Sequence, residues 1–523
     1  AWGFAMRQII RSTVSRELPA YLHIPPGAVI EGDTGIILAL WIFPAAYSFY
    51  LFYPLSKPLS RPLSQSRIAR TLQRWRERFP PHAAPDELPA LSVPAECVQT
   101  LAGPSAFRET LLAQIASARR RILITALYLQ DDDAGREVLD ALYAAHTAHP
   151  QLEIAVYVDW HRAQRGLIGQ RESAGNAARY QAMAKQFGPG VPVYGVPVQR
   201  RELLGVFHFK GFVIDDAVLY SGASLNDVYL QRHGRYRLDR YHLIHSHELA
   251  DSFAALLKNA LRTSPAVCPL DSADIPSRAA LRPEIAKLRK VLARTQYDFA
   301  AAPRQAGAVS ITPLIGLGAR DNALNRTLLQ LIMQARHELV LLTPYFNLPG
   351  PLRHALRRRI KAGCRVTIVL GDKTANDFYI PPEEPFKTIG ALPYLYETNL
   401  RRFCKTNQGT IDAGMLAVHI WKDGSNTFHL KGLLADDDCA LLTGHNLNPR
   451  AWRLDLENGL LIRDPEKRLI GQHRTELAGF LAKTTRLTHY EEIEPIDAYP
   501  QPVQRLIRRL AHVKADRLIN RIL

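Results

Sequence analysis

A long internal repeat constrains the fold of this chain more than any other feature. The stretch TLLAQIASARRRILITALYLQ, which begins at Thr110, resembles TLLQLIMQARHELVLLTPYFN, which begins at Thr327. Thr, Leu, Leu, Ala, Arg and Tyr recur at identical offsets, so that Tyr128 corresponds to Tyr345. Each copy has the pattern of an amphipathic helix followed by a buried strand. Because the repeat period exceeds 200 residues, it indicates two duplicated domains and not a solenoid of short repeats.

The residues around the repeat predict an α/β fold. A second apolar strand follows each copy, LEIAVYVDW at 152–160 and CRVTIVLGDK at 364–373. Alternating helices and short apolar strands are typical of a sheet with helices packed on both faces. We therefore expect two duplicated α/β/α sandwich halves, over residues 105–264 and 311–490. The stretch 265–310 is expected to be a connection, helical from Glu284 to Tyr297.

The same polar motif, His-x-Lys-x4-Asp, stands near the end of each half. It occurs as HFKGFVID and as HLKGLLAD, and gives six candidate catalytic residues: His208, Lys210, Asp215, His429, Lys431 and Asp436. Alternate side chains of a strand point to one face, so each His and Lys should emerge together while the Asp closes the strand at a turn. Downstream, GASLN and GHNLN supply candidate phosphate-binding residues: Ser224, Asn226, Asn446 and Asn448. Since the motifs occupy equivalent points of an independent repeat, we interpret them as the two parts of one site between the halves.

These residue types suit double displacement at a phosphodiester. One imidazole can attack phosphorus and form a covalent phosphohistidine, while the other protonates the leaving oxygen and then deprotonates the incoming nucleophile. Lysine and asparagine side chains can bind the non-bridging oxygens, where negative charge accumulates. No metal and no cofactor is expected, because protein cations supply that charge. The five scattered cysteines form no CxxC pair, and the cluster His242, His245 and His247 lacks HExxH spacing.

The motifs resemble those of the phospholipase D superfamily, from about residue 105 to the C-terminus. Within it, the chain resembles the phosphatidylserine synthases of Gram-negative bacteria. The resemblance is carried by DWHRAQRG (159–166), HFKGFVIDDAVLYSGASLNDVYL (208–230), TPYFNLP (343–349), GDKTANDFYIPPEEPFKTIGALPYLYE (371–397), HNLNPRAWRLDLEN (445–458) and LINRIL (518–523). It implies transfer of a phosphatidyl group from CDP-diacylglycerol to L-serine with release of CMP, by a cytosolic enzyme that docks reversibly on the inner membrane.

The resemblance also assigns roles to single residues. In related enzymes an acidic residue roughly 25 to 32 positions past each histidine holds the imidazole in its reactive tautomer. Asp239 and Glu457 occupy matching places. By superfamily convention His208 is the nucleophile and His429 the acid and base. Arg162 and Arg165 follow the second strand of the first half, where loops at strand ends meet ligands, and are candidate substrate contacts or structural surface residues.

Alternatives remain open at this point. The chain carries 66 Lys and Arg against 49 Asp and Glu, a formal charge of +17, which favours a polyanionic partner, either nucleic acid or an anionic membrane. Another phospholipase D-type enzyme, such as a cardiolipin synthase, a phospholipase or a nuclease, would carry the same motifs. A further alternative is a non-catalytic membrane- or RNA-binding protein that merely retains the fold. It predicts degraded motifs, whereas the His, Lys, Asp and Asn of both motifs are intact. The inferred lipid substrate favours the membrane over a specific nucleic acid.

Both ends of the chain carry expectations of their own. Residues 491–523 are expected to form a basic amphipathic helix, with apolar residues at helical intervals from Val503 and arginines between them, able to lie on an anionic membrane. Residues 1–104 are expected to be an extension with an uncharged apolar run at 35–55 and a Pro- and Ser-rich linker. The apolar run is long enough to cross a bilayer and is interpreted either as a membrane anchor or as a non-native extension.

Overall fold

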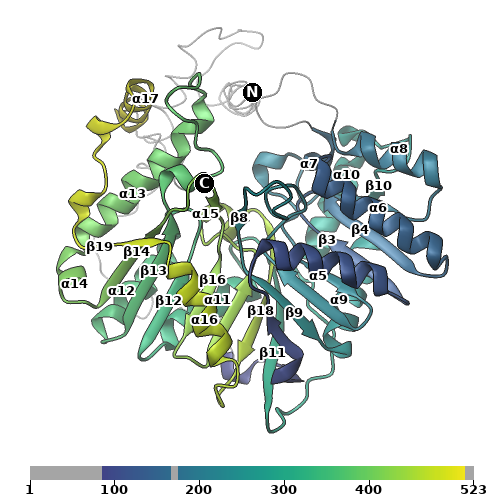
Figure 1. The fold of residues 1–523 in the computed structure, drawn as a ribbon, viewed down its shortest axis with the longest axis horizontal. Coiled ribbons are helices and arrows are strands. Elements are labelled where there is room, and N and C mark those ends of the chain that lie inside the picture. The colour runs from purple at the N-terminus through teal and green to yellow at the C-terminus, as the bar shows by residue number, and fades with distance from the viewer. Residues whose placement is uncertain (1–84, 166–174, 513–523) are drawn as a thin grey trace, which may run out of the picture. The chain divides into compact units, whose positions relative to one another are not determined.

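The computed structural model of the chain describes residues 85–165 and 175–512 (Figure 1). The described residues up to Arg508 belong to one compact unit. None of the described helices combines the length and the hydropathy that a transmembrane span requires. The apolar run predicted at residues 35–55 lies outside the described residues.

The first half is built on an eight-stranded sheet with the order β10-β5-β4-β3-β6-β7-β9-β2. Its central strands β3, β4 and β5 are parallel, and the strands outside them pair antiparallel. The strands are β2 (Val98–Thr100), β3 (Arg121–Thr125), β4 (Glu153–Asp159), β5 (Val193–Val196), β6 (Gly211–Ile214), β7 (Ala217–Ser221), β9 (Tyr241–His245) and β10 (Cys268–Pro269).

The second half repeats this order in a nine-stranded sheet, β1-β11-β18-β17-β16-β12-β13-β14-β19. Again three central strands, β12, β13 and β14, are parallel. The strands are β1 (Leu91–Pro94), β11 (Ala308–Leu317), β12 (Glu338–Leu342), β13 (Arg365–Gly371), β14 (Leu416–Trp421), β16 (Gly432–Ala435), β17 (Cys439–Thr443), β18 (Leu456–Arg463) and β19 (Thr484–Leu487). Read from β10 and from β19, the two sheets match strand for strand, so the predicted duplication and α/β class are confirmed.

The helices form where the apolar residues recur at helical intervals. Helix α5 buries Phe107, Leu111 and Ile115, each four residues from the next, which places them on one face. The helices are α5 (Pro104–Ser117), α6 (Asp133–Ala148), α7 (Trp160–Gln164), α8 (Ala177–Phe187), α9 (His247–Leu256), α10 (Arg278–Leu292), α11 (Ala323–Gln334), α12 (Gly350–Lys361), α13 (Leu392–Thr406), α14 (Gln408–Asp412), α15 (Pro449–Arg453), α16 (Ile470–Leu481) and α17 (Gln501–His512).

Several expected boundaries differ in the structure. Part of the predicted linker forms β1 and β2, which pair with β11 of one half and β9 of the other, because Leu91, Val93 and Val98 are buried with strand alternation. In the connection, α10 begins well before Glu284, since the Ser277 side chain caps its first turn. The C-terminal helix begins at Gln501 and not at residue 491.

Two short parallel pairings join the halves directly ahead of the motifs. Strand β8 (Arg237–Leu238) of the first half pairs with β15 (Thr427–Phe428) of the second. The equivalent contact on the other side is a single bridge between Phe207 and Leu456. Each pairing therefore ties the residue before a motif histidine to the residue before the acidic residue of the opposite half.

Candidate active site

The short parallel pairings between the halves place each motif histidine beside the acidic residue of the other half. The backbone N–H of His208 donates to the carbonyl of Leu456 at 3.1 Å, and that of His429 donates to the carbonyl of Leu238 at 2.8 Å. The next residues along the chain are Glu457 and Asp239. The orienting pairs are therefore His208 with Glu457 and His429 with Asp239, crossed between the halves.

His208 is held by Glu457 in one tautomer. The Nδ1 atom of His208 lies 3.0 Å from Oε1 and 2.9 Å from Oε2 of Glu457, and both side chains are buried. Burial and the nearby Asp455 raise the pKa of Glu457, and the Lys210 and Lys431 ammonium groups oppose that rise. In its carboxylate form Glu457 can only accept, so Nδ1 carries the hydrogen and Nε2 keeps its lone pair. Burial lowers the pKa of His208 well below its ordinary value, and the nearby Lys210 and Lys431 ammonium groups lower it further. His208 is a neutral imidazole with a free Nε2 lone pair.

His429 is held in the opposite tautomer. Its Nδ1 lies 2.5 Å from the Nζ of Lys431 and 2.9 Å from the hydroxyl of Tyr229. An ammonium group can only donate, so Nδ1 accepts and the hydrogen stands on Nε2. Burial, followed by the charge of Lys431, lowers the pKa of His429 to about 4. Asp239 lies 3.7 Å from Nδ1 and reaches this histidine through the lysine.

The two lysines lie inside the site with almost no exposure. Lys431 Nζ donates to Asp239 Oδ2 at 2.6 Å and to the carbonyl of Gly222 at 3.3 Å, and Lys210 Nζ donates to Ser224 Oγ at 3.2 Å. Burial, followed by the charge of Lys431, lowers the pKa of Lys210 to about 7. An anion bound between them would favour the charged form of both lysines.

The two motif asparagines are fixed by their amide oxygens. Asn226 Oδ1 accepts from the Tyr229 N–H at 3.1 Å, and Asn448 Oδ1 accepts from the Ala451 N–H at 2.9 Å as the cap of α15. This orientation directs the amide nitrogen away from the capped turn and makes it the donor end. Asn446 is half-buried, and its backbone carbonyl accepts from Thr343 Oγ1 at 2.9 Å.

The motif aspartates are placed elsewhere, which corrects the expectation that they are catalytic. Asp215 accepts the backbone N–H groups of Arg119, Arg120 and Arg121 at 2.8–3.1 Å. Asp436 accepts those of residues 336–338 at 2.6–3.0 Å. Both stand at the far end of the strand from the His and Lys, in left-handed turns with φ of 48° and 53°. They hold the start of β3 and of β12.

The candidate arginines are engaged within the first half. The guanidinium of Arg162 lies 4.6 Å from the centre of the Tyr128 ring. Arg165 forms a two-pronged ion pair with Glu202, at 2.5 and 2.6 Å. Neither makes a hydrogen bond to His208 or Lys210 among the contacts of the described residues, so these two residues stay predictions.

Three residues that the sequence analysis did not single out lie at the site. Tyr229 contacts His429, Asp377 Oδ2 lies 3.8 Å from His429 Nε2, and Asn458 brackets Lys210. The Asn458 side chain accepts from the Lys210 N–H at 2.8 Å and donates to the Lys210 carbonyl at 2.7 Å. All three lie in runs that carry the family resemblance, and Asn458 also directly follows Glu457.

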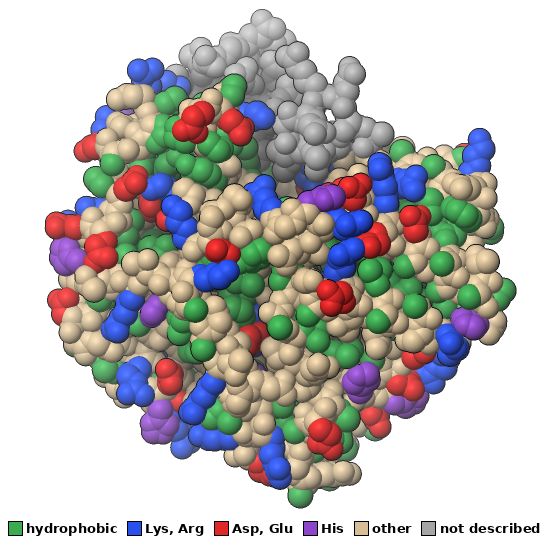
Figure 2. Space-filling view, viewed as in Figure 1, with side chains coloured by type: hydrophobic (Ala, Val, Ile, Leu, Met, Phe, Trp, Pro, Cys, Tyr) green, Lys and Arg blue, Asp and Glu red, His purple; other side chains and the backbone are tan. Residues whose placement is uncertain are grey.

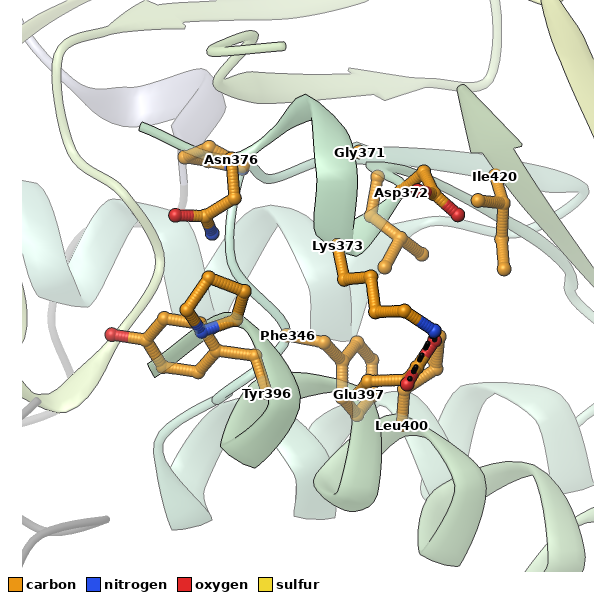
Figure 3. A pocket seen from close by; sticks show the side chains of 12 residues that line it. Phe346, Gly371, Asp372, Lys373, Asn376, Tyr396, Glu397, Leu400 and Ile420 are labelled. Carbon is orange, nitrogen blue, oxygen red and sulfur yellow. Dashed lines mark hydrogen bonds and ion pairs between the residues drawn. The ribbon is translucent and has the colours of Figure 1, made fainter. Parts of the chain in front are cut away.

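A hollow beside the site is lined by residues of the second half (Figure 3). Tyr396, on its wall, stacks on Tyr345 with ring centres 5.3 Å apart, and Tyr345 lies edge-on to His429 at 5.7 Å. The Lys373 ammonium in this hollow is bound to Glu397 at 3.0 Å and to Glu494 at 2.8 Å. Its charge is therefore neutralised by the protein itself.

One group of side chains in the described ranges has ligand atoms close enough to share a metal ion, Asp133, Asp227 and His233. Asp133 and His233 are exposed. Asp227 already accepts the Ala134 N–H at 2.8 Å. Together these contacts hold the start of α6 against the loop after Asn226.

Known proteins match both the sequence and the fold. Residues 328–479 match the family model described as cardiolipin synthase, PLD-like domain. The CDP-diacylglycerol–serine O-phosphatidyltransferases of Escherichia coli and Haemophilus influenzae are 48% and 47% identical, over 86% and 84% of this chain and 99% and 97% of theirs. The crystal structure of phosphatidylserine synthase from H. influenzae matches with a TM-score of 0.81 at 45% identity, and covers 87% of this chain and 100% of that one.

Proposed function

The chain belongs to the CDP-diacylglycerol–serine O-phosphatidyltransferase family of the phospholipase D superfamily, and we propose how its crossed site carries out the reaction. The enzyme transfers a phosphatidyl group from CDP-diacylglycerol to L-serine and releases CMP. The opposite tautomers of the two histidines carry the mechanistic proposal. One histidine offers a lone pair at Nε2 and the other a proton, as double displacement requires.

In the first step His208 is the nucleophile. Its Nε2 attacks the phosphorus that bears the diacylglycerol, while Glu457 holds the hydrogen on Nδ1 and stabilises the positive charge that the ring acquires. The bond from phosphorus to the bridging oxygen of CMP breaks, and His429 Nε2–H protonates that oxygen while Lys431 Nζ, 2.5 Å from Nδ1, passes a proton to Nδ1, so that the ring stays a neutral imidazole. The product of this step is a phosphatidyl group bonded to His208.

In the second step the roles of His429 reverse. Its Nε2, now without a proton, takes the hydroxyl proton of serine while Nδ1 returns its proton to Lys431, and the serine oxygen attacks phosphorus. The phosphorus–nitrogen bond to His208 breaks, and both rings return to their starting states. Lys210 and Lys431, with the amide groups of Asn226 and Asn448, stabilise the non-bridging oxygens in both steps.

CMP exchange tests this mechanism without serine. Labelled CMP should enter CDP-diacylglycerol, because the first step is reversible once the phosphatidyl group is on His208. His208→Ala should abolish both exchange and serine transfer. Exchange in His208→Ala at the wild-type rate would refute the assignment of the nucleophile.

We infer a membrane surface as the place of reaction, on the cytoplasmic side of the inner membrane. Helix α17 presents the exposed side chains of Arg505, Arg508 and Arg509, and cations on such a helix favour anionic lipid head groups. Val503 and Ile507 pack on Tyr394 and Tyr499, so the helix is fixed to the second half through its apolar face. On the face in Figure 2 basic and acidic side chains are intermixed. This supports membrane binding through the local basic helix α17 and not through the net charge of the chain.

A further inference from the structure

An ion pair beside His429 stands where the acceptor alcohol must enter. Asp377 Oδ2 lies 3.8 Å from His429 Nε2, and Asp377 Oδ1 lies 2.8 Å from Nη2 of Arg237. Both side chains are mostly buried, with 16% and 15% exposed. Tyr345 donates its hydroxyl to Asp377 Oδ2 at 3.2 Å. The Nε2 atom of His429 is the proton acceptor of the second step, so a bound acceptor lies within reach of this pair.

Comparison of the two halves indicates that the Asp377 carboxylate is not part of the repeated motif. Strands β4 and β13 begin at Glu153 and Arg365, and counting 12 residues onward from each gives Arg165 in one half and Asp377 in the other. The intervening segments differ, a helix at Trp160–Gln164 and a 3-10 turn at Lys373–Ala375. Asp377 lies near His429, whereas Arg165 is bound to Glu202.

The ion-pair partner of Asp377, Arg237, also differs in charge from its counterpart in the other half. Arg237 stands two residues before Asp239, and its counterpart two residues before Glu457 is Asp455. Asp455 is bound to Arg450 at 3.1 Å. Both positions thus change sign between the halves, which indicates that the side of His429 meets a ligand that the side of His208 does not.

We propose that Asp377 and Arg237 form the subsite that recognises the charged groups of the acceptor amino acid, Asp377 binding the ammonium and Arg237 the carboxylate. This inference rests on the proposed function, because it takes a zwitterionic alcohol as acceptor. A hydroxyl hydrogen-bonded to His429 Nε2 lies about 3 Å from it. Since only two carbons separate hydroxyl from ammonium in serine, the ammonium can reach the neighbouring Asp377.

The ion pair between Asp377 and Arg237 can also serve the release of CMP and the entry of serine in turn. Before serine enters, Arg237 can bind the phosphate of the departing CMP, with Asp377 holding the guanidinium in place. The same guanidinium then accepts the carboxylate of serine. An acceptor without an ammonium group lacks the contact with Asp377, and one without a carboxylate lacks the contact with Arg237, so both are disfavoured.

Acceptor competition tests the subsite. Transfer from CDP-diacylglycerol is measured with L-serine, with 3-hydroxypropionate, which lacks the ammonium, and with ethanolamine, which lacks the carboxylate. In Asp377→Asn, the KM for serine should rise about 10- to 100-fold, as expected for the loss of a charged hydrogen bond. The preference for serine over 3-hydroxypropionate should fall by at least about tenfold. Arg237→Gln should instead reduce the preference for serine over ethanolamine.

Each preference is a ratio within one preparation, so partial unfolding of a variant cancels. Asp377→Glu keeps the charge and should restore part of the preference for serine. Glu384→Gln, exposed on the same loop, is the matched control and should leave all ratios at the wild-type value. If Asp377→Asn lowered transfer to all three acceptors by the same factor, Asp377 would act through His429. That result would overturn the proposed subsite. A wild-type enzyme that performs CMP exchange but no serine transfer would overturn the proposed function instead.

Discussion

Glu457 accepts the Nδ1 hydrogen of His208 across the boundary between the halves, with both carboxylate oxygens within 3.0 Å. The two residues are 249 positions apart in the chain. Neither half therefore contains a complete catalytic histidine system. The duplication produced two motifs, and the parallel contacts at Phe207–Leu456 and at β8–β15 make each motif dependent on the other half.

Glu457→Gln should slow both CMP exchange and serine transfer by about 100- to 10,000-fold, the range seen when the orienting carboxylate of a catalytic histidine becomes an amide. An amide can also donate to Nδ1, which would place the hydrogen on Nε2 and remove the nucleophilic lone pair. Steady-state exchange rates provide the measurement. Glu491→Gln, on the exposed surface, is the control. Exchange within twofold of the wild type in Glu457→Gln would contradict the crossed assignment.

Asp215→Ala should lower stability far more than turnover. The variant loses three backbone hydrogen bonds at the start of β3 and places alanine at a φ of 48°, so we expect a loss of about 1–3 kcal/mol in the free energy of unfolding. Urea denaturation measures that loss, and the kcat of the remaining folded enzyme should stay within threefold. Asp216→Ala removes surface ion pairs from the adjacent residue and should cost less than about 1 kcal/mol. A kcat reduced a hundredfold in folded Asp215→Ala would return this aspartate to the catalytic set.

Lys210→Met should abolish transfer while stabilising the protein at neutral pH, because burial disfavours the charged ammonium. Burial lowers the pKa of Lys210 from 10.5 to about 7, so between pH 7 and 10.5 the unfolded chain holds a proton that the folded chain lacks. Stability from this group therefore rises with pH in that window, by at most about 1.4 kcal/mol per pH unit. The advantage of methionine should be greatest below pH 7 and shrink towards pH 10.5. The exposed Lys258→Met is the control, and an advantage that stays constant with pH would disprove the buried charge.

Replacing Arg505 and Arg509 together by Gln should weaken binding to vesicles that contain anionic phospholipid by about 30-fold, since each cation near such a surface contributes about 1 kcal/mol. Sedimentation with lipid vesicles measures the partition coefficient. Arg282→Gln, an exposed arginine of α10, should change binding less. Equal binding of the double variant and the wild type would exclude α17 as the docking element.

The repeat and the motif spacing were enough to predict the duplicated α/β halves and the residues His208, Lys210, His429 and Lys431 that meet at their boundary. The crossing of Glu457 and Asp239 could not be predicted, because sequence offsets do not reveal how two halves dock. The roles of Asp215 and Asp436 were misjudged for a related reason. A conserved spacing from the histidine is consistent with either end of a strand, and only the fold shows which end faces the site.

Strands β1 and β2 were missed because four and three residues between prolines and short turns give little strand periodicity. Tyr229 and Asp377 were missed because each acts on the histidine of the second motif from a loop outside any motif. Their alignment depends on tertiary contacts, in particular the 2.8 Å ion pair between Arg237 and Asp377.

The assignment of His208 as the nucleophile is tested by locating the covalent intermediate. The enzyme is mixed with CDP-diacylglycerol labelled in the phosphatidyl group, in the absence of serine, quenched under conditions that preserve phosphohistidine, and digested for mass spectrometry. We expect the phosphatidyl adduct on His208, and its loss when serine is added before the quench. An adduct on His429, or the absence of any adduct while CMP exchange proceeds, would contradict this assignment.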